Sequence, residues 1–167
     1  MEDFLKLLKI RRSIRGFQNK DIPQEQLEKI VDTARFAPSA RNVQPWEFVV
    51  VTDKNKIAEL ANLGQNAGFM AQAPACIAVF CADTRYFLED GSAATCNILL
   101  SATALGIGSC WIAGDKKPYC LQVNALLNAP SGMKLISLIA LGYPQEENTF
   151  KIAEKRALQE LLHWEKF

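Results

Sequence analysis

Residues 90–112 read DGSAATCNILLSATALGIGSCWI, and this stretch decides the fold. Residues 90–105 are apolar on nearly every face of a helix, which predicts a central helix that is packed all round. Residues 108–112 follow almost at once as a short strand. A buried helix that leads directly into a strand favours an α+β domain over an all-β protein or a helical bundle.

The flanking segments supply the rest of the sheet and its helices. Further core strands are predicted where β-branched, aromatic or other apolar residues run together, at 46–52 (WEFVVVT), 75–82 (ACIAVFCA) and 135–142 (LISLIALG). Helices are predicted over 2–10, from Pro23 until Pro38 ends the element, near 54–61 and over 118–128. We therefore expect one α+β domain over residues 1–167.

The chain changes character after Pro144. It becomes polar there and then returns to apolar residues at Leu158, Leu161, Leu162 and Trp164. Such a tail can fold back on its own core or reach across to a partner chain, and its pattern fits both.

Charge and hydropathy exclude several classes of partner. Nineteen Lys and Arg residues balance 18 Asp and Glu residues, for a net charge of +1, whereas a nucleic-acid surface usually needs a basic excess. The longest apolar runs, such as residues 73–82 with Pro74 inside, are too short to span a bilayer. No signal-peptide pattern opens the chain. We expect a cytoplasmic protein with no membrane or nucleic-acid partner.

Cysteine and histidine usage limits the chemistry. The five cysteines are odd in number and none has C-x-x-C spacing, which favours buried, reduced thiols. His163 is the single histidine. A zinc site or a Ser-His-Asp triad would depend on scattered cysteines or on this one side chain, so we expect no metal. If the protein is a catalyst, its reactive group is borrowed from a cofactor.

The glycine-rich phosphate motifs fail. Gly106 and Gly108 begin a G-x-G-x-x-G pattern, but Trp111 stands at its last glycine. Residues 108–116 do not form a P-loop either, because no Gly-Lys-Ser/Thr closes them. Neither a Rossmann fingerprint nor a Walker motif is present.

Two polar stretches remain as candidates. Arg11, Arg12, Ser13 and Arg15 follow the first helix and offer planar donors for a phosphate dianion; a solvated basic turn at a helix C-terminus explains the same spacing. Residues 37–46 (APSARNVQPW) are stiffened by two prolines and carry amides and a guanidinium. That loop suits the edge of a flat heterocycle, and it also suits an ordinary helix-to-strand connection.

Together these stretches resemble the nitroreductase family of FMN-dependent oxidoreductases. The family's Arg-Arg-Ser-x-Arg-x-Phe run matches residues 11–17, its Pro-Ser-x-x-Asn-x-Gln-Pro-Trp loop matches residues 38–46, and its Leu-Gly-x-Gly-x-x-Trp segment matches residues 105–111. Leu141-Gly142-Tyr143-Pro144 and the basic pair Lys155-Arg156 also fit. The resemblance implies a nitroreductase-like fold with a central mixed or antiparallel sheet flanked by helices, a long buried helix, and a C-terminal extension exchanged in a homodimer.

The resemblance also implies a site for FMN. Arg11, Arg12, Ser13 and Arg15 would contact its phosphate, ribityl chain and pyrimidine edge, and Arg156 with Lys155 would close on the phosphate. The partner subunit would supply Pro38, Ser39, Ala40, Arg41 and Asn42. The strand end Ile112, Ala113 and Gly114 would present backbone N–H groups to flavin N5, and Gln65 or Asn66 would meet the ribityl chain. No side chain is expected to be catalytic.

The resemblance implies hydride transfer from NAD(P)H through FMN to a nitroaromatic or quinone by a ping-pong mechanism. Two departures from the family pattern bear on this. Ala113 stands where larger members have an acidic residue, and the chain has little room for their lid over the flavin. Two alternatives therefore stay open: a flavin-binding or flavin-sensing protein, and an enzyme of the same fold with another task, such as reductive dehalogenation or flavin destruction.

Overall fold

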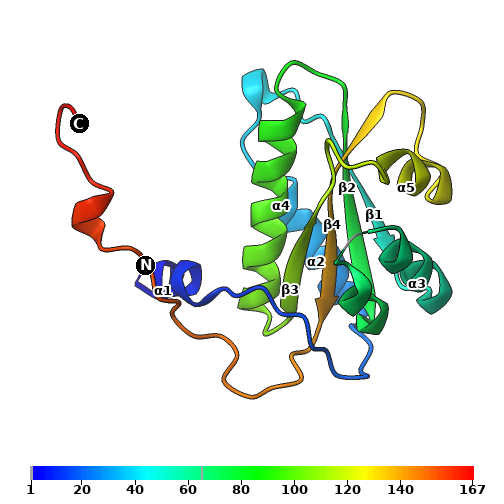
Figure 1. Ribbon diagram of the computed structural model, residues 1–167, viewed down its shortest axis with the longest axis horizontal. Coiled ribbons are helices and arrows are strands. Elements are labelled where there is room, and N and C mark those ends of the chain that lie inside the picture. Colours follow the sequence, from blue (N-terminus) through cyan, green and yellow to red (C-terminus); the bar gives the residue numbers. More distant parts are fainter. Residues whose placement is uncertain (1, 65) are drawn as a thin grey trace.

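A computed structural model describes residues 2–64 and 66–167 (Figure 1). Four strands form one sheet in the order β1-β2-β4-β3: β1 (Trp46–Val51), β2 (Ala75–Ala82), β4 (Met133–Gly142) and β3 (Gly108–Ala113). Every neighbouring pair is antiparallel. The expected mixed or antiparallel sheet is therefore antiparallel among the described strands, and β1 and β3 form its edges.

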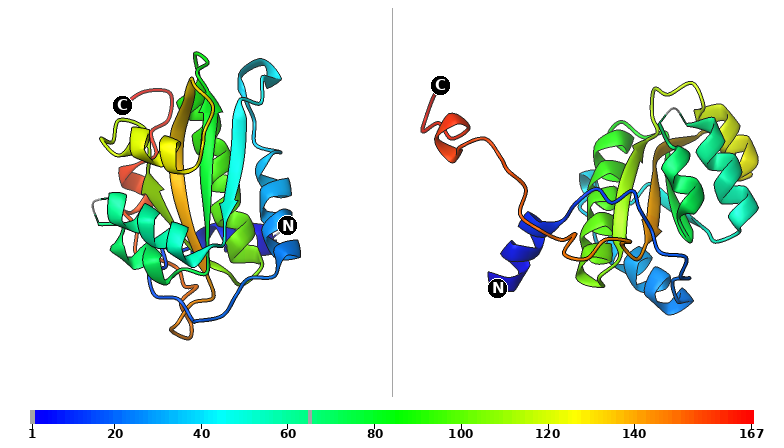
Figure 2. Two further views of the ribbon diagram at one scale, coloured as in Figure 1. Left: turned by 90° about the vertical axis from the view of Figure 1, so that its right-hand side faces the viewer. Right: turned by 60° about the horizontal axis from the view of Figure 1, so that its bottom comes forward.

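Helices cover both faces of this sheet (Figures 1 and 2). One face carries α2 (Gln24–Ala34) and α4 (Phe87–Ala104), and the other carries α3 (Lys54–Leu63) and α5 (Cys120–Leu126). The side chains of β2 alternate between the two faces of the sheet and contribute to both cores. Ile77 and Val79 belong to the core with α2 and α4, whereas Cys76 and Phe80 belong to the core on the other side, as the alternation of a strand requires.

The predicted strands and helices are confirmed, with differences at their ends. α2 ends at Ala34, well before Pro38. α5 begins at Cys120 rather than at 118, because Lys117 donates its N–H to the Gly114 carbonyl and closes a turn first (3.1 Å). The predicted all-round burial of α4 holds only in part: Ile98 and Ala102 are fully buried, but the opposite face exposes Cys96.

The cysteines follow their sequence environments. All five are free thiols, and Cys76, Cys81 and Cys110 are buried as expected, whereas Cys96 is exposed. Burial raises the pKa of the Cys76 thiol to about 12, so this side chain packs in the sheet as an uncharged apolar group.

Both ends of the chain project from the body. α1 (Glu2–Ile10) touches the body mainly through α4, and the tail beyond Gln145 extends away from the sheet and its helices (Figures 1 and 2). They expose large apolar side chains, among them Phe4, Leu158, Leu161 and Trp164, the last at 77% of its surface. The tail therefore does not fold back over its own core. None of the helices among the described residues combines the length and apolarity needed to cross a membrane.

Candidate functional site

The arginine run is fixed to the free edge of β3. Ile14 donates its N–H to the Ser109 carbonyl (2.9 Å), and Ser13 pairs with Ser109 in a parallel bridge. The Ile14 side chain is buried. These contacts hold residues 11–15 as an extended segment beside the sheet, so the cluster is not a free solvated turn.

A hollow of about 800 Å³ opens beside this segment. Its described lining contains five cations and no carboxylate: Leu8, Lys9, Arg11, Arg12, Ser13, Arg15, Ile152, Ala153 and Lys155. Among the ion pairs found in residues 2–64 and 66–167, none involves Arg11, Arg12 or Arg15. Guanidinium groups without carboxylate partners, beside a hydroxyl, form the donor set that a phosphate dianion prefers.

Lys155 and Arg156, the basic pair of the tail, have different neighbours. Lys155 lines the hollow of about 800 Å³ beside the arginine run. Arg156 instead donates from Nε to Glu160 Oε2 at 3.1 Å, one helical turn along the tail. In the single chain the structure therefore brings Lys155, and not Arg156, to the arginine cluster.

Arg15 connects this hollow to a second one. The second hollow has about 550 Å³ and lies between β3 and the helices α3 and α5, with Arg15, Asn66, Ile112 and Ala113 in its lining. The Arg15 guanidinium lies over the Phe69 ring, 5.7 Å from its centroid. Arg15 is thus a lining residue of both hollows. Gln65, the other predicted contact, lies outside the described residues.

The hydrogen bonds of β3 decide which of its N–H groups face the second hollow. Gly114 donates its N–H to the Ile136 carbonyl on β4 at 3.0 Å. Because successive residues of an antiparallel strand alternate in direction, Ile112 also faces β4, whereas Ala113 faces the open edge. Of the three predicted backbone donors, Ala113 alone points its N–H toward the site.

Cys110 shows the electrostatic character of the site. It lines the second hollow and is buried. Burial raises the pKa of its thiol, while the nearby charges of Arg15 and Arg11 and a hydrogen bond with Ser13 lower it in part. The thiol stays protonated near neutral pH, so it serves as packing in a positive environment rather than as a nucleophile.

The loop at residues 38–42 lies elsewhere in this chain. None of its five residues is among the described residues that line either hollow. The loop is nevertheless ordered: Ala40 donates its N–H to the buried carboxylate of Asp90 (3.0 Å), and Gln44 donates its N–H to Ser39 Oγ (3.0 Å). Arg41 and Asn42 are exposed and held at positive φ. One chain alone does not unite the loop with the arginines.

Sequence reasoning missed part of the second hollow. Phe69, Lys117, Tyr119 and Gln122 line it, and the Tyr119 hydroxyl donates a hydrogen bond to the Ala113 carbonyl. For Lys117, Tyr119 and Gln122 the available signal was their position directly after β3, in a turn and a short helix that return to the same edge. Phe69 lies before β2, in the short helical turn Gly68–Gln72, and carried no such signal.

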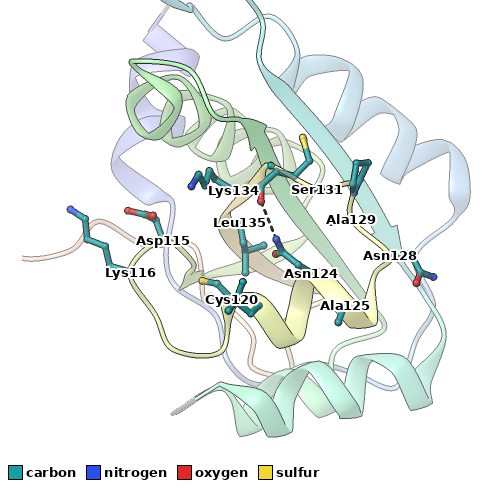
Figure 3. A pocket seen from close by; sticks show the side chains of 14 residues that line it. Asp115, Lys116, Cys120, Asn124, Ala125, Asn128, Ala129, Ser131, Lys134 and Leu135 are labelled. Carbon is teal, nitrogen blue, oxygen red and sulfur yellow. Dashed lines mark hydrogen bonds between the residues drawn. The ribbon is translucent and has the colours of Figure 1, made fainter.

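A third hollow, of about 660 Å³, lies between α5 residues such as Asn124 and the start of β4 at Lys134 and Leu135 (Figure 3). Asn124 lines this hollow and donates a hydrogen bond from Nδ2 to the Met133 carbonyl at 2.9 Å. Cys120 also lines it and donates its thiol to the Gly114 carbonyl at 3.1 Å. None of the arginines 11, 12 and 15 is among the residues that line this space.

Comparisons with known proteins identify the family of this chain. The family model "Nitroreductase family" matches residues 8–67, and "Putative TM nitroreductase" matches residues 64–166. A relative from Archaeoglobus fulgidus, named "Putative NADH dehydrogenase/NAD(P)H nitroreductase", is 37% identical over 100% of both chains.

Two further proteins are more distant. The structure of an "FMN-dependent Nitroreductase" from Clostridium difficile R20291 matches with a TM-score of 0.90 at 31% identity, and covers 98% of this chain and 99% of that one. Human "Iodotyrosine deiodinase 1" is 25% identical over 96% of this chain and 68% of its own length. With two family models that together span most of the chain and a full-length relative above 30% identity, this chain belongs to the nitroreductase family.

Proposed function

We propose that this protein is an FMN-dependent oxidoreductase that transfers a hydride from NAD(P)H, through bound FMN, to an electron-poor acceptor such as a nitroaromatic or quinone. One observation carries the proposal: an arginine cluster fixed to the β3 edge has no carboxylate partner among the described residues, and its Arg15 also lines a second hollow with Ala113. The similarity to an FMN-dependent nitroreductase supports this assignment.

The residues of the site fit FMN along its length. Arg11, Arg12, Ser13 and Lys155 would hold the phosphate in the larger hollow. Arg15 would reach the pyrimidine edge from its position between the two hollows, and Asn66 would meet the ribityl chain. When bound, FMN supplies a centre at N5 that accepts and releases a hydride. The chain's task is to orient this centre, with the Ala113 N–H as the neighbouring donor.

A ping-pong mechanism follows if one open face serves both substrates in turn. Trp111, Lys117 and Gln122 line the outer part of the second hollow and would border that face. NAD(P)H would occupy it first and leave before the acceptor binds. A separate dinucleotide fold is then unnecessary, in agreement with the missing glycine at Trp111.

We further propose a homodimer in which each flavin site uses both chains. Residues 38–42 are ordered, exposed and remote from the arginines of their own chain, as expected of a loop that reaches the partner's site. The apolar surfaces of α1 and the tail, which the single chain leaves open, would be buried in the same interface. We propose that the tails are exchanged between the two chains.

The first test is the colour of the protein. Purified protein is expected to show flavin absorbance, and NAD(P)H added without oxygen is expected to bleach it within seconds. Bleaching by dithionite but not by NAD(P)H would favour a flavin sensor instead. A colourless protein that fails to bind added FMN would refute the proposal.

The second test is the link between assembly and cofactor. Dilution that separates the chains is expected to release FMN, because a site completed by residues 38–42 of the partner loses those contacts. Sedimentation and FMN fluorescence measured on the same dilution series would show both events together. A monomer with full FMN occupancy would contradict the shared site.

Reductive dehalogenation is a second candidate for the same site. The similarity to human iodotyrosine deiodinase 1 over 96% of this chain favours testing it. Reoxidation of the NAD(P)H-reduced protein should be compared with a nitroaromatic, a quinone and iodotyrosine under the same conditions. Faster reoxidation by iodotyrosine than by the other two would replace the proposed acceptor class and leave the FMN site in place.

A further inference from the structure

Tyr119 forms a hydrogen bond with the backbone carbonyl of Ala113 at the β3 edge. The tyrosine is buried, at 6% exposure, and its hydroxyl donates a hydrogen bond to the Ala113 carbonyl. Both residues line the second hollow together with Arg15. In the proposed FMN site, the backbone carbonyl of Ala113 therefore already accepts a hydrogen bond from a side chain of the same protein, that of Tyr119. The inference below rests on that proposed function.

The alternation of the strand makes this contact specific. In an extended strand the N–H and the C=O of one residue point to the same side. Gly114 is bonded to Ile136 on β4, so Ala113 directs both its donor and its acceptor to the open edge. With the Tyr119 hydroxyl on the carbonyl, Ala113 offers a flavin a free N–H and a carbonyl that already accepts one hydrogen bond.

The chemistry of N5 makes this difference matter. In oxidised FMN, N5 carries no proton and accepts a hydrogen bond. One electron and one proton convert it to an N5–H group, which donates, and a second electron completes the reduction. Both reduced states carry N5–H, so a free carbonyl beside N5 would accept from it and stabilise the one-electron-reduced state relative to oxidised FMN. A carbonyl that already accepts from Tyr119 would do so less well, and an N–H would not do so at all.

We propose that Tyr119 is a positioning residue that withholds the Ala113 carbonyl from flavin N5 and thereby disfavours one-electron-reduced FMN. Tyr119 acts through the backbone and need not touch the acceptor. Its ring packs in the core beside Ile112 and Val123, which keeps the hydroxyl at the strand edge.

The test is an anaerobic titration of the FMN-loaded protein with small additions of dithionite, followed by absorbance and electron spin resonance. Tyr119→Phe keeps the ring and removes only the hydroxyl. We expect the variant to make the one-electron-reduced state about fivefold more favourable relative to oxidised FMN, the size of one net hydrogen bond. The unaltered protein is expected to pass from oxidised to fully reduced without accumulating it.

Cys120→Ala is the matched control. It removes a side-chain hydrogen bond to the adjacent carbonyl, that of Gly114, from the same short helix. The Gly114 carbonyl also accepts a hydrogen bond from the Lys117 N–H in the turn. Cys120 is not among the described residues that line either of the two hollows proposed to hold FMN. We expect the control to titrate like the unaltered protein. A general loosening of α5 would affect both variants alike.

The outcomes separate the two proposals. Failure of the unaltered protein to bind FMN would overturn the proposed function. Normal FMN binding with the same yield of one-electron-reduced flavin in Tyr119→Phe and the unaltered protein would overturn the role of Tyr119 alone. If Tyr119→Phe does not fold, Tyr119→Met repeats the test. Accumulation of the one-electron-reduced state in the unaltered protein overturns the role without any variant.

Discussion

Replacing Arg11 with alanine is expected to weaken FMN binding by about 1.5–3 kcal/mol, or roughly 10- to 150-fold in Kd, the range for a hydrogen bond to a charged group. The reason is that Arg11 lines the hollow of about 800 Å³ beside the arginine run and has no carboxylate partner among the described residues. Quenching of free FMN fluorescence during titration with protein measures the change directly.

Arg35→Ala is the control for Arg11→Ala. It removes the same charge from the residue that follows α2, where Arg35 pairs with Asp32 at 2.6 Å on an exposed surface. FMN affinity should stay unchanged, because an exposed pair of this kind contributes little and does not line the site. If both variants lost affinity equally, overall charge would explain the binding, and the phosphate contact would have to lie elsewhere.

Replacing Gly114 with alanine is expected to destabilise the fold by about 1–3 kcal/mol or more, the usual cost of forcing an atom into a packed region. A Cβ at this position would lie 2.6 Å from the carbonyl carbon and oxygen of Ile136 and from the carbonyl oxygen of Leu135. All three are backbone atoms that cannot swing aside. Denaturant unfolding measures the loss, and FMN binding should fall as well because the end of β3 must move.

Gly68→Ala is the matched control for Gly114→Ala. A Cβ there would meet no atom within 4 Å. The same chemical change should therefore leave the free energy of unfolding nearly unaltered. Equal stability of Gly114→Ala and the unaltered protein would show that β3 and β4 can separate at this point without cost, contrary to the Gly114–Ile136 hydrogen bond.

The fold was largely predictable because its strands are short apolar runs. Residues 75–81 are buried on both faces of the sheet, and the apolar run 75–82 predicts a strand without ambiguity. Helix ends were less predictable. Pro38 was expected to end the second helix, but the helix stops at Ala34 and a turn follows through Phe36 and Ala37. A proline limits how far a helix can extend but does not oblige the helix to reach it.

The candidate site was predictable only where charge marks it. The arginine run is visible in the sequence, and in the structure it lines a hollow with no carboxylate among its described lining residues. The division of Lys155 from Arg156 was not predictable, because it depends on Glu160 capturing one of two adjacent cations. The contact of Tyr119 with Ala113 was hidden for a similar reason: it forms when the turn after β3 returns the chain to the strand edge.

The alternating direction of β3 also has an evolutionary consequence. A donor that belongs to the backbone is preserved by strand register and not by residue identity, so the side chain at position 113 can change freely while the donor stays in place. An insertion or deletion of one residue within Gly108–Ala113 would instead exchange the inward and outward positions of the strand. Natural variation should therefore tolerate many amino acids at this site but very few changes in its length.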